Sequence, residues 1–492
     1  MVVDWRRSVT MILAVTAVAS LTAVTGSGGA TAGTRAAAAP RAAIAVRWGA
    51  AQEMPGSAAL NQGGDAQVNS VSCSSPGNCS AGGFYTDSAG GDQAFAASEV
   101  KGTWRAPIEV PGTAALNKYA YAWINSVSCA SAGNCSAGGF YANNGLQVFV
   151  VNQVNGIWHK AIEVPGSAAL NRRGGASVQS VSCATPGDCS AGGYYLAKNF
   201  QAFVASEVNG IWQNAIEVPG TASIPPPGDA TPTAEVNSVS CASAGNCTIG
   251  GSYDVSASVQ AFVASEVNGI WHKAREIPGS AALNTGGYAQ VSSVACASAG
   301  NCSAGGYYTD SRGYEQLMVV NEVNGTWHDA IEIPGTAALN LGDNVGVSSV
   351  SCASAGNCSA GGWYMGSGSL SHPFVVNEVN GTWHTAIEVP GSAALTTGSI
   401  FSQVVSLSCA SAGNCSAAGW YTDSSDHTQP FVVDEVNGIW RNAIEVPGIT
   451  ALNQGGDAAI NAMSCAPAGS CSAIGFYTDS SNHRQLFVVS KN

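Results

Sequence analysis

The 492 residues carry few charges (10 %), and their 31 acidic side chains outnumber 18 basic ones, which gives a formal net charge of −13. Such an acidic chain is a poor partner for nucleic acid or for an anionic membrane surface, because both are negatively charged. Sixty glycines and many small and β-branched residues favour short strands and tight turns over helices, while a hydrophobic content of 46 % is ample for a folded core.

The N-terminal segment is typical of an export signal. Arg6 and Arg7 precede an apolar run from Val9 to Val24, and an Ala-rich stretch then ends at Pro40. The apolar run is too short and too interrupted by Thr and Ser for a membrane span. We therefore predict a leader at 1–40, a single domain at 41–492, and a protein that is secreted or held in the cell envelope.

All sixteen cysteines fall into eight pairs with five residues between partners. In an exported chain, local disulfides explain this spacing best. Zinc is the competing interpretation, but each pair stands alone in its repeat and no histidine follows at metal-site spacing. We expect no metal and no cofactor. The predicted disulfides are Cys73–Cys79, Cys129–Cys135, Cys183–Cys189, Cys241–Cys247, Cys296–Cys302, Cys352–Cys358, Cys409–Cys415 and Cys465–Cys471.

These pairs mark repeats of 54–58 residues, and each repeat is predicted to contain four strands. In the third copy the strands are expected at 179–183, 189–195, 201–208 and 211–218. The last two are joined by Asn209-Gly210, a strong signal for a type I′ hairpin turn. On the fourth strand of the second copy, alternation predicts Trp158, Lys160, Ile162 and Val164 on one side and His159, Ala161 and Glu163 on the other.

The ends of the chain predict how the repeats are closed. The eighth copy has only its first three strands, 461–490, and the missing fourth strand matches 46–54 near the N-terminus. A ring completed in this way leaves no unpaired sheet edge. We therefore predict an all-β, eight-bladed β-propeller with four antiparallel strands and one disulfide per blade, closed by the N-terminal strand.

The segment from Ser206 to Trp212 resembles a degenerate Asp-box, the hairpin between the third and fourth strands of sialidase-like propeller blades. One residue is missing after the glycine, and no Asp occupies the acidic position. The repeats also resemble Cys-paired propellers of secreted actinobacterial proteins, similar in style to photosystem-assembly-factor propellers. The Asp-box is a folding element in those blades, so the resemblance implies the fold and says little about activity.

Strand order separates the loops into two faces. Disulfide loops and Asn-Gly turns share one face, whereas the longer, more variable loops share the other, where binding is expected. At the base of each variable loop is a Tyr, followed in four copies by Thr-Asp. Aromatic planes beside Asp and Asn suit sugar binding, although the same residues could end a strand and form an Asx-turn. The ligand-binding candidates are Tyr85, Asp87, Tyr308, Asp310, Tyr421, Asp423, Tyr477 and Asp479.

Other features gave weaker candidates. A Glu recurs on every fourth strand, as a locally paired carboxylate or as a ligand contact at a blade junction. The segments that depart from the repeat pattern, candidates for a specific contact, are 224–232, 119–123 and Arg172-Arg173. Gly63-Gly64-Asp65 and Gly455-Gly456-Asp457 lack the alternating acidic run of a calcium loop and are interpreted as turns.

No catalytic set stands out in the sequence. A sialidase-like site needs three converging arginines, yet Arg105, Arg275 and Arg441 fall on fourth strands, toward the rim. We therefore predict a non-enzymatic, monomeric binding protein, multivalent through its repeats, whose partner is a glycan or an extracellular protein. The alternatives are a glycan-active hydrolase with one central site and a structural cell-envelope scaffold.

Overall fold

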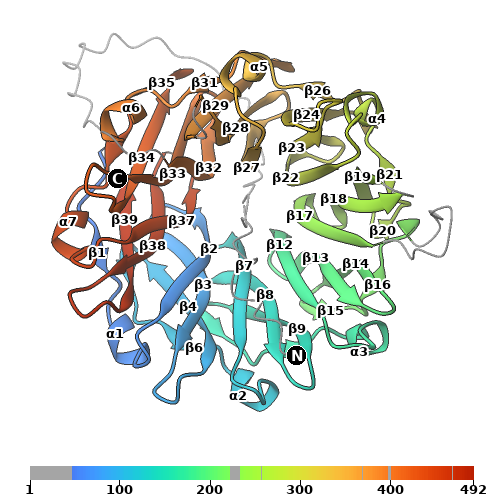
Figure 1. Ribbon diagram of the computed structural model, residues 1–492. Helices are drawn as coiled ribbons and strands as arrows, with labels where there is room; N and C mark the ends of the chain where they lie inside the picture. The colour runs from blue at the N-terminus through green and yellow to red at the C-terminus, as the bar shows by residue number, and fades with distance from the viewer. Residues whose placement is uncertain are drawn as a thin grey trace, which may run out of the picture.

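Eight antiparallel sheets are arranged as blades around a common axis in the computed structural model (Figure 1), which describes residues 47–221, 233–255, 258–367, 370–396, 401–467 and 469–491. Blades 1 to 7 follow one another in chain order, and blade 8 combines the last three strands with β1. The predicted all-β, eight-bladed propeller is confirmed.

The four strand positions of a blade run outward from the axis. The first strands are β2 (Ala66–Ser75), β7 (Ala122–Ser131), β12 (Ser177–Thr185), β17 (Ala234–Ser243), β22 (Ala289–Ser298), β27 (Val345–Ser354), β32 (Ser402–Ser411) and β37 (Ala458–Cys465). The second strands are β3 (Asn78–Thr86), β8 (Asn134–Ala142), β13 (Asp188–Leu196), β18 (Asn246–Val255), β23 (Asn301–Thr309), β28 (Asn357–Met365), β33 (Asn414–Thr422) and β38 (Cys471–Thr478).

The third strands are β4 (Asp92–Val100), β9 (Leu146–Val154), β14 (Phe200–Val208), β19 (Ser258–Val267), β24 (Glu315–Val323), β29 (Ser371–Val379), β34 (Thr428–Val436) and β39 (Arg484–Lys491). The outer strand of blades 1 to 7 consists of two short pieces: β5 (Thr103–Trp104) and β6 (Ile108–Glu109), β10 (Ile157–Trp158) and β11 (Ile162–Glu163), β15 (Ile211–Trp212) and β16 (Ile216–Glu217), β20 (Ile270–Trp271) and β21 (Arg275–Glu276), β25 (Thr326–Trp327) and β26 (Ile331–Glu332), β30 (Thr382–Trp383) and β31 (Ile387–Glu388), and β35 (Ile439–Trp440) and β36 (Ile444–Glu445). In blade 8 it is β1 (Gln52–Glu53).

One-turn helices connect successive blades. They are α1 (Ser57–Leu60), α2 (Thr113–Leu116), α3 (Ser167–Leu170), α4 (Ser280–Leu283), α5 (Thr336–Leu339), α6 (Ser392–Leu395) and α7 (Ile449–Leu452). Each follows a glycine with positive φ, such as Gly56 at 76°, a conformation that costs a residue with a Cβ more than it costs glycine. After α3, Asn171 Nδ2 donates to Leu146 O at 2.8 Å, which fixes the helix to the preceding third strand.

The break in the outer strand corrects one prediction. Trp158 is buried, but so is Ala161, whereas Ile162 is 45 % exposed, so the expected alternation of Trp158 with Ile162 is wrong. The cause lies in the neighbouring blade, because the Ala161 N–H donates to Pro111 O at 2.7 Å. The residues between β10 and β11 therefore leave the sheet, and the alternation of buried and exposed side chains is shifted after the gap.

All eight predicted disulfides form, each joining paired residues of a first and second strand such as Cys183 and Cys189. The hairpin turns have the positive φ angles of type I′, with Asn155 at 51° and Gly156 at 82°. Gly156 N–H donates to Gly133 O in the disulfide loop at 2.8 Å. These turns and loops (155–156 and 132–133 in blade 2) form what we call the disulfide face.

The other surface, here called the loop face, consists of the loops after the second strands, such as 143–145 in blade 2, and the loops between blades, such as 110–121 between blades 1 and 2. The Lys118 N–H donates to Ala142 O at 2.9 Å, which joins the two kinds of loop. The predicted division of the loops into two faces is therefore confirmed.

Adjacent blades contact each other through one repeated polar arrangement. Among the residues that the structure describes, a third-strand side chain hydrogen-bonds the preceding blade in seven of the eight blades, as when Glu378 accepts hydrogen bonds from Ser303 Oγ at 3.3 Å and from the amide of Asn321. The outer-strand Trp383 Nε1 then donates to Asn321 Oδ1 at 3.1 Å. The residues at this third-strand position are Glu99, Gln153, Glu207, Glu266, Glu322, Glu378, Glu435 and Lys491.

Ring closure reverses the charge of this arrangement. As predicted, the N-terminal strand completes blade 8, with Gln52 opposite Val488. Here Lys491 Nζ donates to Asp434 Oδ1 at 3.0 Å and to Ser416 Oγ at 3.1 Å, and Trp48 Nε1 donates to Asp434 Oδ1 at 3.2 Å. Blades 1 to 6 have Asn or Ser at the position of Asp434.

We predict that Lys491→Glu destabilises the ring, because it places two carboxylates together in a largely buried junction. The expected loss is about 3 kcal/mol of unfolding free energy. The double variant Lys491→Glu/Asp434→Asn recreates the Glu435–Asn377 contact of the preceding junction, and we expect it to recover most of the loss. Urea unfolding of the oxidised protein measures both. A double variant as unstable as the single one would contradict this account.

Candidate functional site

The repeat Tyr at the base of each loop-face loop is buried in all eight blades, with Tyr421 only 3 % exposed. Its hydroxyl donates to the recurring Glu of the outer strand in the same blade, at 2.6–3.5 Å. The pairs are Tyr85–Glu109, Tyr141–Glu163, Tyr195–Glu217, Tyr253–Glu276, Tyr308–Glu332, Tyr364–Glu388, Tyr421–Glu445 and Tyr477–Glu53. The structure thus places the four candidate tyrosines, Tyr85, Tyr308, Tyr421 and Tyr477, where their rings are covered by protein.

These pairs raise the pKa of every one of the eight tyrosines. Burial makes the largest contribution, because it disfavours the phenolate, and the carboxylate that accepts the hydrogen bond raises the pKa further in each pair. Each pair joins the second strand to the outer strand, so its geometry fits a structural contact within the blade.

The four candidate aspartates shape the loops that follow. Asp87 Oδ1 accepts hydrogen bonds from the Ala89 and Gly91 amides at 2.8 and 3.0 Å, and its Oδ2 accepts one from Gln93 at 2.9 Å. Burial raises the pKa of Asp87, but these hydrogen bonds lower it more, so it lies below its usual value. Asp310, Asp423 and Asp479 accept backbone hydrogen bonds in the same pattern. Each of these aspartates therefore forms an Asx-turn, which the sequence allowed as the alternative to sugar binding.

The segments that break the repeat pattern take separate positions. Trp123 stacks on Phe84 of the preceding blade, with ring centroids 4.2 Å apart, while Tyr119 is exposed. The Arg173 N–H donates to Leu196 O in a loop-face turn, and the Gly63 N–H donates to Thr86 O, in keeping with a turn. The segment 224–232 lies outside the described residues, as does the predicted leader.

A hollow of about 390 Å³ opens on the loop face where blade 5 meets the start of blade 6. Its aromatic wall is formed by Tyr288 and Tyr307, stacked with centroids 5.8 Å apart and ring planes at 12°. Its polar lining includes Glu315, Asp343 and Asn344. Glu315 Oε2 accepts a hydrogen bond from the Val345 amide at 3.4 Å.

Burial raises the pKa of Glu315 and of Tyr307, and Tyr288 and Glu315 add to the rise at Tyr307. Tyr288 remains 37 % exposed. The hollow therefore combines an accessible aromatic ring with carboxylate and amide oxygens.

Sequence reasoning pointed to this face but to other residues. Tyr307 directly precedes the buried Tyr308, and successive side chains of a strand point to opposite faces. In blade 5 the residue before the repeat Tyr, Tyr307, was therefore the better candidate. Tyr288 lies at a position that Asp65, Tyr121 and Phe401 occupy in other copies, so it carried no repeat signal.

Among the residues that the structure describes, no group of three or more His, Cys, Asp or Glu side chains is placed to hold a metal ion. In the same part of the chain, no helix is long and apolar enough to cross a membrane.

No protein-family model matches the sequence, and a comparison with characterised proteins gave no match. Solved structures with a similar arrangement include Sqt1 of Chaetomium thermophilum, at 10 % identity and a TM-score of 0.47 over 87 % of this chain and 95 % of that one. They also include a neuraminidase-like protein of A/flat-faced bat/Peru (12 % identity, TM-score 0.36, 90 % and 93 %) and an ulvan lyase (9 % identity, TM-score 0.40, 90 % and 95 %). At these values the similarity carries no argument about activity or ligand.

The tyrosine pairs predict how stability depends on pH. Tyrosine normally ionises near pH 10, and its pKa is higher in the folded protein than in the unfolded chain. The unfolded chain therefore loses protons first as the pH rises, so the free energy of unfolding is unaffected below about pH 9 and falls above about pH 10. Urea unfolding across this range measures the slope.

We expect Tyr421→Phe to reduce that slope, because it removes one of the shifted phenols. Tyr119→Phe is the matched control, since Tyr119 is 63 % exposed and lies outside the pairs. Equal slopes for the wild type and Tyr421→Phe would show that the buried phenols do not control alkaline unfolding.

Proposed function

We propose that this protein is an exported, non-catalytic binding propeller that recognises a glycan in the hollow between blades 5 and 6. The observation that carries the proposal is the accessible Tyr288 ring beside Glu315, Asp343 and Asn344. Eight disulfides support export, because such bonds persist in oxidising compartments.

The lining matches the chemistry of a sugar. One side of a pyranose ring presents C–H groups that pack on an aromatic plane, and its hydroxyls donate to carboxylate and amide oxygens. A volume of about 390 Å³ falls in the range of small-ligand sites. The carboxylates of Glu315 and Asp343 disfavour an anionic sugar, so the proposed ligand is a neutral or amino sugar at the end of a glycan.

The proposal specifies one site per chain. Several equivalent sites were expected from the repeated tyrosines, but those rings are buried on their glutamates. The hollow instead uses residues that differ between blades: Arg484 lies in blade 8 and Phe200 in blade 3 where blade 5 has Glu315.

A glycan-array screen of the oxidised protein, followed by calorimetry on a hit, tests the proposal. We expect one site per chain and, for Tyr288→Ala, affinity lowered roughly ten-fold or more through the lost aromatic contact. Tyr314→Ala is the control, because Tyr314 is exposed and lies between Gly313 and Glu315 in the chain but does not itself line the hollow. Unchanged affinity in Tyr288→Ala, or turnover of the glycan, would overturn the proposal.

A further inference from the structure

The junction between blades 4 and 5 departs from the polar arrangement that the other junctions share. Glu322 and Trp327 occupy the usual positions on β24 and β25 and are only 5 % and 6 % exposed. Among the residues that the structure describes, neither Glu322 Oε2 nor Trp327 Nε1 has a hydrogen-bond partner. In the same described part of the chain, Trp104 Nε1 and Glu435 Oε2 also lack partners at two other junctions. There, however, the third-strand carboxylates are bonded, because Glu99 accepts from Ser472 at 3.3 Å and Glu435 Oε1 accepts from the Asn377 amide.

Two substitutions within the repeat coincide with this departure. Thr248 replaces the Ser that follows the second cysteine of the other blades, and its Oγ1 lies 3.5 Å from Cys302 Sγ. Arg275 replaces the Ile found at this position in the other complete blades, 1 to 3 and 5 to 7. Both residues line the same cavity.

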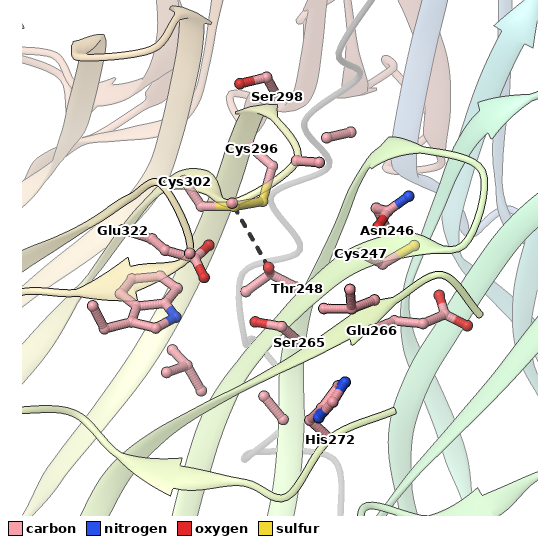
Figure 2. A pocket seen from close by; sticks show the side chains of 18 of the residues that line it. Asn246, Cys247, Thr248, Ser265, Glu266, His272, Cys296, Ser298, Cys302 and Glu322 are labelled. Carbon is pink, nitrogen blue, oxygen red and sulfur yellow. Dashed lines mark hydrogen bonds between the residues drawn. A yellow bond between two sulfur atoms is a disulfide. The ribbon is translucent and has the colours of Figure 1, made fainter. Parts of the chain in front are cut away.

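The cavity has a volume of about 450 Å³, and Figure 2 shows the carboxylate of Glu322 beside Thr248 and the disulfide loop of blade 5. Ser298 and Gly300 of that loop also line it, so it lies toward the disulfide face, on the other side of the ring from the hollow at Tyr288. The two sites are therefore separate.

Glu322 and Trp327 present their polar groups together. Their Cα atoms are directly opposed in the β24–β25 pair, and opposed residues project to the same side of a sheet. One offers a buried acceptor and the other a buried donor, and leaving such groups unpaired is costly. A ligand that relieves both needs a donor and an acceptor only a few atoms apart.

The charges around the cavity indicate the charges of the donor and the acceptor on such a ligand. His272, Lys273 and Arg275 line it from the outer strand of blade 4, while Glu322 approaches from blade 5. Glu322 and Arg275 line the same cavity; burial raises the pKa of Glu322, and the Arg275 guanidinium lowers it. An anion thus fits beside Arg275 and Trp327 Nε1, and a cation fits on Glu322.

We infer that this junction pocket binds a free α-amino acid, with its ammonium group on Glu322 and its carboxylate on Trp327 Nε1 and Arg275. An α-amino acid carries the two charges on adjacent carbon atoms, which matches a donor and an acceptor that project side by side. The cavity volume leaves room for a side chain.

Calorimetric titration of the oxidised protein with a panel of free L-amino acids tests this assignment. The N-acetyl and amide derivatives of any hit remove one charge each, and we expect each to bind at least ten-fold more weakly. Glu322→Gln and Arg275→Ile, the latter restoring the repeat residue, should lower affinity roughly ten- to hundred-fold, as expected for a lost charged hydrogen bond. Glu378→Gln, the same change at a junction where the carboxylate is partnered, should leave affinity unchanged.

Three outcomes would overturn the assignment: no heat with any amino acid, as for a pocket that holds only water; derivatives that bind as well as the parent; or affinity that is unchanged in Glu322→Gln and Arg275→Ile. Arg275 is exposed, so Arg275→Ile keeps the test valid if the buried Glu322→Gln variant fails to fold. A glycan hit that Tyr288→Ala abolishes would leave this result unaffected, because the two sites lie on opposite faces.

Discussion

Buried serine hydroxyls on the first strands hold successive blades together near the axis of the ring. In seven blades the amide of the first cysteine donates to a Ser Oγ of the preceding blade, as when Cys129 N–H donates to Ser72 at 3.0 Å. A buried amide without a partner is costly, so a Ser directly before the first cysteine is needed in almost every copy. In blade 5, which precedes the blade of Cys352, the equivalent residue is Ala295. The ring therefore tolerates one missing hydroxyl.

The same requirement for paired polar groups operates farther from the axis, with different consequences. Glu378 meets Ser303 and an Asn, and this junction is tightly paired. Lys491 pairs with Asp434, so the charges at the closing junction differ from those at the Glu378 junction. Glu322 meets Thr248 without a hydrogen bond, and a cavity lies there. The same third-strand position thus joins two blades tightly, pairs the closing junction or borders a pocket, depending on the residues that face it.

The fold was predictable because its signals are local and repeated eight times. Cysteine spacing gave the disulfides, and Asn-Gly gave the hairpin turns. The break beside Ala161 was not predictable, because the carbonyl that causes it belongs to Pro111 of another blade. Likewise, Tyr421 and Glu445 both recur visibly, but their contact spans 24 positions and two turns. Hence the sequence marked the tyrosines as a pattern without showing that they are buried.

Both candidate sites were beyond sequence reasoning for a related reason. The hollow at Tyr288 and the pocket at Glu322 lie where two blades meet, so each depends on side chains from different repeats. Equivalent positions of the repeats show only what the blades share. The informative residues here are those that differ, such as Arg275 in place of Ile, and their meaning depends on which neighbour they face.

Closure by β1 also determines the order in which the protein can fold. Tyr477 hydrogen-bonds Glu53 across 424 positions, so blade 8 cannot be completed until nearly the whole chain has been synthesised. Until then, seven blades can form by local pairing, while β39 presents an open edge to any other strand. A second copy of the chain offers the same strand, so crowded, incompletely folded molecules are at risk of exchanging it. Closure of the ring within a single chain thus depends on β1.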